Sequence, residues 1–259
     1  MAGAAGALPT AGPRRRGRPR RQPRPDERAG ATVDDIVAAA AALFRERGIQ
    51  AVTMADIAER AGLRQPSLYY YFSSKIDVLG HILDDVNRIP LSIVEQARNA
   101  DGPVAIRIYW LIYQDVLALC RFPFDINEIH RLSAGHPREF ERYWLERQRL
   151  NDEVEALVTA GVDAGELRDL DPRLAALALL ANDEATQNWL RPVGTHRLRG
   201  RLDATLGDYR PEEVADHTAE MALRHLLVRP STVDAVRARA LALAPDDAPC
   251  PTVSLPSAN

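Results

Sequence analysis

The residues between positions 65 and 71 carry hydrogen-bonding and aromatic groups at a density that suggests recognition of another molecule. They are Gln65, Ser67, Tyr69, Tyr70 and Tyr71. Leu68 and Phe72 lie one helical turn apart and can face a protein interior. A helix this short cannot also bury three consecutive tyrosine rings. At least one ring and its hydroxyl must therefore face outward, where it can contact a partner.

Two short helices joined by a tight turn are predicted to carry these side chains. Thr53 followed by Asp56 is a capping-box pattern, which predicts a helix that begins at Met54. Gly62 tolerates the positive φ with which such a helix can end, and Pro66 suits only the first turn of the next. This pattern is typical of a helix-turn-helix, whose second helix fits the DNA major groove. The alternative is a helical hairpin inside an ordinary bundle, with half-exposed tyrosines.

The same stretch resembles the DNA-binding domain of the TetR family of transcriptional regulators. About fifty residues carry the resemblance with the family's spacing throughout, and the rest of the chain shows no family-specific motif. The resemblance implies an N-terminal three-helix helix-turn-helix domain and a larger C-terminal helical bundle for ligand binding and dimerisation. The matching residues are Ile36, Ala39, Ala40, Leu43, Phe44, Gly48, Thr53, Asp56, Ile57, Ala58, Ala61, Gly62, Leu68, Tyr69, Tyr70, Tyr71, Phe72 and Lys75.

The resemblance also implies how single residues would contact double-stranded operator DNA. Gln65 and Ser67 would face the major groove, where a planar amide can match the donor and acceptor of adenine. The three tyrosines would divide between base methyl groups and phosphates, with Tyr69 partly in the interior. Lys75, and Thr53 with the amides beside it, would contact the DNA backbone, which positions the domain without reading sequence.

Arg64 departs from the family's pattern, because family members often have a small capping residue at this position. Arginine is a poor N-cap, so we expect a looser start to the second helix. Two roles remain open for the Arg64 side chain, contact with a phosphate and contact with a guanine.

A basic arm precedes the first predicted helix. Residues 1–31 are rich in Ala, Gly, Pro and Arg without periodicity, a composition that predicts disorder. Residues 1–30 hold eight arginines against two acidic residues although the whole chain has a net charge of -3, so the arm should meet a polyanion. Arg16 and Arg18 lie in an Arg-Gly-Arg-Pro sequence that resembles an AT-hook core and suits a narrow minor groove. The alternative is a generic tail that adds only salt-dependent affinity.

The remaining patterns are helical, so we predict an all-α protein. Residues 103–121 are apolar on nearly every side, which is typical of a helix buried in the middle of a bundle. Further helices are expected near 33–47, 124–132, 137–161, 172–190, 211–227 and 233–244. The predicted parts are a disordered arm (1–31), a DNA-binding domain (32–78), a ligand-binding and dimerisation domain (79–229) and a partly disordered tail (230–259).

A homodimer is expected, because one helix-turn-helix reads only a few base pairs and operators usually present two half-sites one helical turn apart. Two stripes of small and aliphatic residues are candidates for the interface, and the resemblance implies a four-helix seam from the last two helices. The alternative is that both stripes pack internally. The stripes are Leu174, Leu177, Ala178, Ala181 and Ala185, and Val214, Ala215, Thr218, Ala219, Ala222 and Leu226.

A small-molecule effector is expected in the middle of the bundle, in an apolar pocket with a few polar groups. Its binding would have to favour a conformer in which the recognition helices no longer fit the operator. The alternative is a filled core, which would make the protein a ligand-independent architectural DNA-binding protein. The candidate lining residues are Trp110, Tyr113, Gln114, Leu117, Phe140, Tyr143, Trp144, Asn182 and Trp189.

Composition and motifs argue against other classes of protein. No apolar run is long enough to span a bilayer, so we expect no membrane partner. Cys120 and Cys250 lie in unlike contexts, which fits a reducing cytoplasm without a disulfide. His130 and His136 are six positions apart and do not share a helical face, and no phosphate loop, nucleophile motif or paired-cysteine cluster is present. We therefore expect a cytoplasmic repressor that has no enzymatic activity, cofactor or metal.

Overall fold

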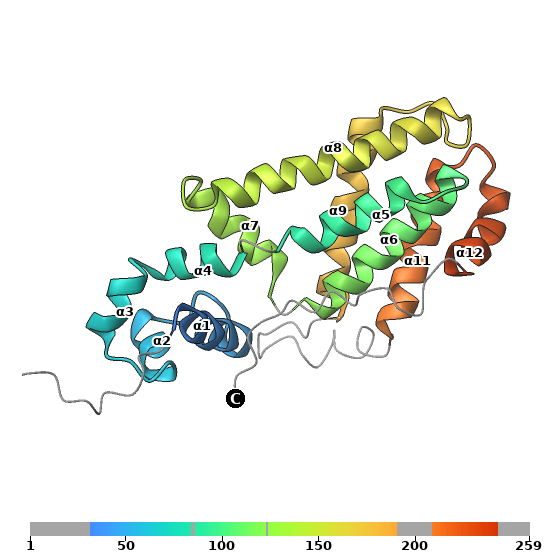
Figure 1. Ribbon diagram of the computed structural model, residues 1–259. Helices are drawn as coiled ribbons and strands as arrows, with labels where there is room; N and C mark the ends of the chain where they lie inside the picture. The colour runs from blue at the N-terminus through green and yellow to red at the C-terminus, as the bar shows by residue number, and fades with distance from the viewer. Residues whose placement is uncertain (1–31, 84–85, 123, 191–208, 243–259) are drawn as a thin grey trace, which may run out of the picture. The chain divides into compact units, whose positions relative to one another are not determined.

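The computed structural model describes residues 32–83, 86–122, 124–190 and 209–242, and the side chains of 188–190 are not part of that description. Within these ranges every regular element is a helix, apart from one isolated bridge between Leu167 and Leu227 (Figure 1). The prediction of an all-α protein is confirmed. The arm, with Arg16 and Arg18, and the end of the tail lie outside the described residues.

Four short helices form the N-terminal part of the described chain. Both predicted capping boxes are present, because Thr32 and Asp35, and likewise Thr53 and Asp56, exchange hydrogen bonds. The first helix has its expected bounds and buries one face built from Ile36, Ala40, Leu43 and Phe44. The helices are α1 (Val33–Arg47), α2 (Met54–Arg60), α3 (Gln65–Tyr71) and α4 (Lys75–Leu83).

The larger part is a bundle around α6, which packs against α5, α8, α9, α11 and α12 (Figure 1). Its burial on most sides is what the unbroken apolar pattern of residues 103–121 predicted. No helix in the described ranges combines the length and hydropathy needed to cross a membrane. The elements are α5 (Arg88–Asn99), α6 (Val104–Arg121), α7 (Ile126–Gly135), α8 (Glu141–Asp163), α9 (Pro172–Leu190), α11 (Pro211–Leu226), η1 (Pro230–Thr232) and α12 (Val233–Ala242).

The hydrophobic residues form two clusters, and the smaller one joins the DNA-binding helices to the bundle. It contains the core of α1–α4 together with residues from the start of α7 and α8. The boundary expected between residues 78 and 79 falls inside this cluster, since Val78 and Leu79 both belong to it. Movement of α7 or α8 would therefore be felt directly by the helix-turn-helix. The bundle residues of the cluster are Phe124, Ile126, Ile129, Phe140 and Tyr143.

The two expected dimer stripes have different surroundings. On α9, Leu174 is 64% exposed and Leu177 is 44% exposed, and Ala178 and Ala181 are exposed too. On α11 the stripe is internal, because Val214, Ala215, Thr218, Ala219 and Leu226 are buried. The prediction for α11 was therefore wrong, since its small residues permit close packing against α6 within the same chain.

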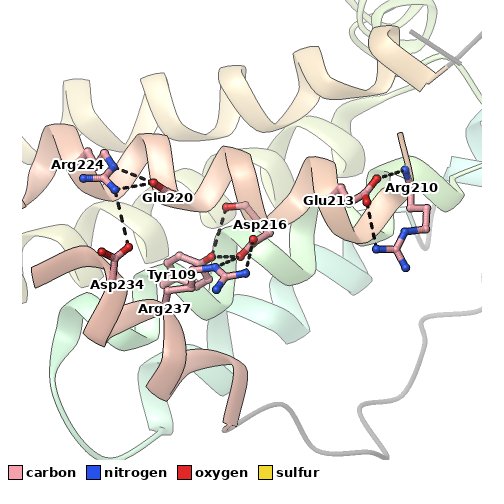
Figure 2. Close-up of polar contacts among 8 residues, drawn as sticks. All are labelled: Tyr109, Arg210, Glu213, Asp216, Glu220, Arg224, Asp234 and Arg237. Atoms are coloured by element: carbon pink, nitrogen blue, oxygen red, sulfur yellow. Dashed lines mark hydrogen bonds and ion pairs between the residues drawn. The ribbon is translucent and has the colours of Figure 1, made fainter. Parts of the chain in front are cut away.

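Polar contacts fix α11 in this orientation. Asp216 accepts hydrogen bonds from the Tyr109 hydroxyl of α6 and from Arg237 of α12, the latter at 2.6 and 2.7 Å (Figure 2). The exposed side of α11 carries His217, Met221 and Arg224 instead of the expected stripe.

Candidate nucleic-acid interface and effector site

The turn between α2 and α3 is closed by backbone hydrogen bonds that require a positive φ. Gly62 has a φ of 69°, a value at which a side chain would cause strain. The Gly62 N–H donates to the Glu59 carbonyl at 3.1 Å, and the Leu63 N–H donates to the Ala58 carbonyl at 2.8 Å. These bonds end α2 in the manner that the glycine predicts and set the direction in which α3 leaves.

Helix α3 is anchored by one face and exposes the other. Leu68 is fully buried and Phe72 is 5% exposed, as their spacing predicts. Tyr70 is 84% exposed, Tyr69 49% and Tyr71 40%. The side chains of Gln65 and Ser67 are exposed on the same helix. The candidate recognition residues are therefore available to a partner, and Tyr69 is only partly covered by the protein.

Arg64 occupies the N-cap of α3 and its side chain makes no capping hydrogen bond. The side chain is exposed, and no ion-pair partner for it lies within the described ranges. Its guanidinium can therefore reach a phosphate or a base edge, which are the two roles left open by the sequence.

Lys75 does not have the surroundings expected for a DNA-backbone contact. Its Nζ donates to three backbone carbonyls, those of Ile49 at 2.8 Å, Gln50 at 3.1 Å and Val52 at 2.8 Å. An ammonium group has three N–H donors, and all of them are directed at the loop between α1 and α2. This geometry corrects the expectation and makes Lys75 a clamp that holds the loop before α2.

Thr53 is also engaged within the domain. Its hydroxyl takes part in the capping box, accepting from the Asp56 N–H at 3.2 Å while it donates to the Asp56 carboxylate. Hydrogen bonds from Thr53 hold the pKa of Asp56 below its usual range. A contact between this position and a phosphate would have to come from backbone amides rather than from the side chain.

The surface around α3 is close to neutral. Residues 31–80 contain five basic and six acidic side chains. Two of the basic groups are neutralised locally, because Arg60 pairs with Glu46 at 2.8 Å and Arg47 with Asp56 at 3.4 Å. Exposed arginines such as Arg45 and Arg64 remain available for phosphates. Charge alone would give this domain weak affinity for DNA.

The expected effector residues do not form one lining. Trp110, Tyr113 and Leu117 belong to the large cluster around α6, whereas Tyr143 and Trp144 belong to the cluster shared with α1–α4. The expected lining residue Gln114 is half-buried on α6, and Phe140 is buried just before α8. The rings of Tyr143 and Trp144 lie 5.3 Å apart, and both lie 6.1 Å from the ring of His130.

One expected effector residue faces solvent. Asn182 is exposed on α9, and the side chain of Trp189 lies outside the described residues. The prediction for Asn182 was wrong by one position, since the inward residue of this turn is Asp183. A rotation of about 100° separates neighbouring residues of a helix, so a small error in the assumed face exchanges the two.

Two buried acids were missed. Asp115 is 8% exposed on α6 and Asp183 is fully buried on α9. Burial raises the pKa of Asp115 to about 7, and burial with the charge of Asp115 raises the pKa of Asp183 well above its usual value. A signal was present in the sequence, because Asp115 is the one acidic residue of a helix that reads as buried on every side.

A separate groove lies at the start of α6. It has a volume of about 480 Å³ and is lined by residues of α6, α12 and the segment before η1, including Ile106, Val228 and Arg239. None of the expected effector residues lines it.

Comparisons with known proteins agree with the helix-turn-helix interpretation. The family model of the bacterial regulatory proteins of the tetR family matches residues 36–82, and that of a tetracyclin repressor-like C-terminal domain matches residues 126–200. The transcriptional repressor KstR2 of Rhodococcus jostii is 28% identical over 182 residues, which cover 62% of this chain and 80% of that protein.

Solved structures show the same architecture. A TetR/AcrR-family regulator of Thermobifida fusca has a TM-score of 0.54 and 27% identity, covering 74% of this chain and 96% of that one. The complex of AibR with isovaleryl coenzyme A and operator DNA has a TM-score of 0.59 at 19% identity, covering 73% and 96%, a likeness in fold. Because the models of both parts of such a regulator match in order along one polypeptide, this chain belongs to the TetR family of DNA-binding transcriptional regulators.

Proposed function

We propose that the protein is a homodimeric repressor that occupies an operator through α3 and leaves it when a small molecule binds in the C-terminal bundle. The observation that carries this proposal is the exposure of Tyr70, at 84%, on a helix anchored by Leu68 and Phe72. A soluble core gains nothing from a large ring in that position, whereas a DNA groove offers it methyl groups and phosphates. Acting on operator DNA, the protein would work in the cytoplasm.

The residues that we assign to DNA lie on the exposed side of α3 and at its start. Gln65 and Ser67 read base edges, and Tyr70 and Tyr71 contact base methyl groups or phosphates. Arg64 adds a cationic contact. The arm, through Arg16 and Arg18, supplies much of the sequence-independent attraction that the nearly neutral domain lacks.

The dimer interface is assigned to the apolar face that α9 leaves exposed. Leu174 and Leu177 expose large aliphatic side chains beside the small residues Ala178 and Ala181. Small residues let the helix of a second subunit approach closely, while the leucines supply buried apolar area. Met221 on the exposed side of α11 is 44% exposed and extends this surface.

Contacts between the bundle and the helix-turn-helix provide a route for the effector signal. Gln187 of α9 holds the start of α7, because its Oε1 accepts from the Ile126 N–H at 2.9 Å. Two residues later, the carboxylate of Glu128 accepts from the Gln50 N–H at 3.2 Å, in the loop before α2. A ligand that displaces α7 or α9 would move the DNA-binding helices and change the separation of the two α3 helices.

Selection of bound sequences from random DNA with the purified full-length protein tests this proposal. We expect a palindromic consensus with half-sites about one helical turn apart, about 10 base pairs. A reporter promoter that contains the selected site should be repressed when the protein is expressed. A consensus without symmetry would contradict the homodimer, and increased transcription would contradict repression.

A further inference from the structure

Two carboxyl groups face each other across the interior of the bundle without a cation of their own. Asp183 on α9 is fully buried, and neither of its carboxylate oxygens has a hydrogen-bond partner in the part of the chain that the structure describes. Asp115 on the adjoining helix α6 is 8% exposed and lies within electrostatic reach of it. Buried carboxylates in native proteins are normally paired, so this arrangement calls for an explanation.

The groups around the two acids do not neutralise them. Arg147 of α8 forms an ion pair with Glu184, the residue next to Asp183, so its charge is already engaged. His130 of α7 lies 3.7 Å from Glu184 through its Nδ1, but burial lowers its pKa and favours the neutral ring. The positive charge on the surrounding elements is therefore balanced before Asp115 and Asp183 are counted.

Further polar atoms at this place have no partner. The Tyr143 hydroxyl and His130 Nε2 are both buried and without a hydrogen bond in the described structure, and the Tyr143 side chain is 3% exposed. Tyr143 lies in the same electrostatic cluster, because its pKa responds to Arg147 and Glu184. Four elements thus direct unsatisfied groups at one region: α6, α7, α8 and α9.

A purely structural role does not account for the cluster. Apolar residues of similar size would stabilise the bundle better than unpaired acids do. A metal site is not indicated either, because the described His, Cys, Asp and Glu residues include no group of three placed to hold an ion. Groups that weaken the fold and are shaped to bind a complementary charge are typical of ligand sites.

We propose that Asp115 and Asp183 form the polar end of the effector site and that the effector carries a protonated amine on an apolar body. The ammonium would be held between the two carboxylates, and Tyr143 and Trp144 would contact the apolar part and the cation through their ring faces. A carboxylate, phosphate or thioester of an acidic carrier would be repelled by the same pair. This inference rests on the proposed function, whose effector it assigns to a chemical class.

The position of the cluster suits control of DNA binding. His130 and Tyr143 lie on α7 and α8, and Tyr143 packs in the hydrophobic cluster shared with α1–α4. Asp183 lies one helical turn before Gln187, whose side chain holds the start of α7. Binding of an amine between Asp115 and Asp183 would act on both routes to the helix-turn-helix.

Three probes with one apolar body test the charge preference in the full-length protein. They are 4-phenylbutylamine, 4-phenylbutanol and 4-phenylbutyrate, compared by calorimetry and by thermal unfolding at pH 8. We expect the amine to bind at least about tenfold more tightly than the alcohol, with the butyrate weakest. Its affinity should fall as pH is lowered, because protonated Asp115 and Asp183 no longer attract a cation and the already neutral His130 adds little.

The Asp183→Asn variant separates binding from folding. It should lose at least about tenfold in amine affinity while its melting temperature without ligand equals or exceeds that of the wild type, because an unpaired carboxylate has been removed. Asp101→Asn, at an exposed position, is the matched control and should change neither quantity.

The inference is overturned if the amine binds no tighter than the alcohol or the butyrate, including the case in which none of them binds. It is equally overturned if Asp183→Asn destabilises the protein and leaves amine binding intact. Operator binding measured in the same samples separates the two proposals. Wild-type protein that fails to bind a selected operator refutes the proposed function, whereas amine binding that spares the operator supports the site and refutes its coupling to DNA.

Discussion

Replacing Lys75 with methionine should weaken the fold of the DNA-binding helices without changing how salt affects operator binding. The Lys75 Nζ donates to the carbonyls of Ile49, Gln50 and Val52 at 2.8 to 3.1 Å, so it closes the loop that leads into α2. Methionine has a similar length and no donor, and therefore leaves three carbonyls without this partner.

The expected loss follows from the surroundings of the three bonds. A hydrogen bond to a charged group contributes about 1.5–3 kcal/mol, but the bond to Gln50 is exposed and water can replace it. The bonds to Ile49 and Val52 are partly buried. Burial lowers the pKa of Lys75, which means that desolvation offsets part of the gain. We therefore expect a decrease of about 2–3 kcal/mol in the free energy of unfolding.

Urea denaturation of the full-length protein measures this decrease. Arg45→Met, which removes an exposed cation from α1, is the control and should cost less than about 0.5 kcal/mol. Lys75→Arg should not restore stability, because a planar guanidinium does not match three converging carbonyls. The slope of log K against log salt should stay unchanged in Lys75→Met. A protein of normal stability whose slope falls by about 0.9 would refute this role and restore the phosphate contact.

Three further outcomes are expected. The raised pKa of Asp115, about 7 in the folded chain, means that the folded state holds a proton that the unfolded state releases, so stability should fall between about pH 4 and pH 7 by up to about 4 kcal/mol. Asp115→Asn should flatten this fall in urea titrations, and an unchanged profile would contradict the burial of a free carboxyl. Deletion of residues 1–30, which carry eight arginines, should reduce the salt dependence of DNA binding, and an equal slope would show that the arm does not touch DNA. Leu177→Glu on α9 should give a folded monomer with weak operator binding in sedimentation and binding assays, whereas Leu145→Glu, at a 65% exposed position on α8, should remain dimeric.

Local signals predicted the DNA-binding helices well, because each depends on residues close in sequence. The capping boxes that begin at Thr32 and Thr53, and the positive φ at Gly62, are properties of three- to six-residue stretches. The inward face of α3 also follows from local spacing, since Leu68 and Phe72 are separated by one turn.

The errors arose where long-range packing decides. Helical periodicity shows that α11 has a small-residue face but not whether that face meets α6 or a second subunit. Lys75 has a long side chain whose target depends on the path of a loop more than twenty residues earlier. Asn182 and Asp183 exchange places through a rotation that periodicity cannot fix. Asp115, in contrast, could have been recognised as an acid in a wholly buried helix.

Operator binding by Tyr70→Ala tests most directly whether the exposed face of α3 reads DNA. Because Tyr70 is 84% exposed, its removal should leave the free energy of unfolding within about 0.5 kcal/mol of the wild type. The account predicts that affinity for the selected operator falls at least about tenfold while affinity for random DNA is retained. Wild-type affinity and selectivity in a correctly folded Tyr70→Ala protein would contradict it.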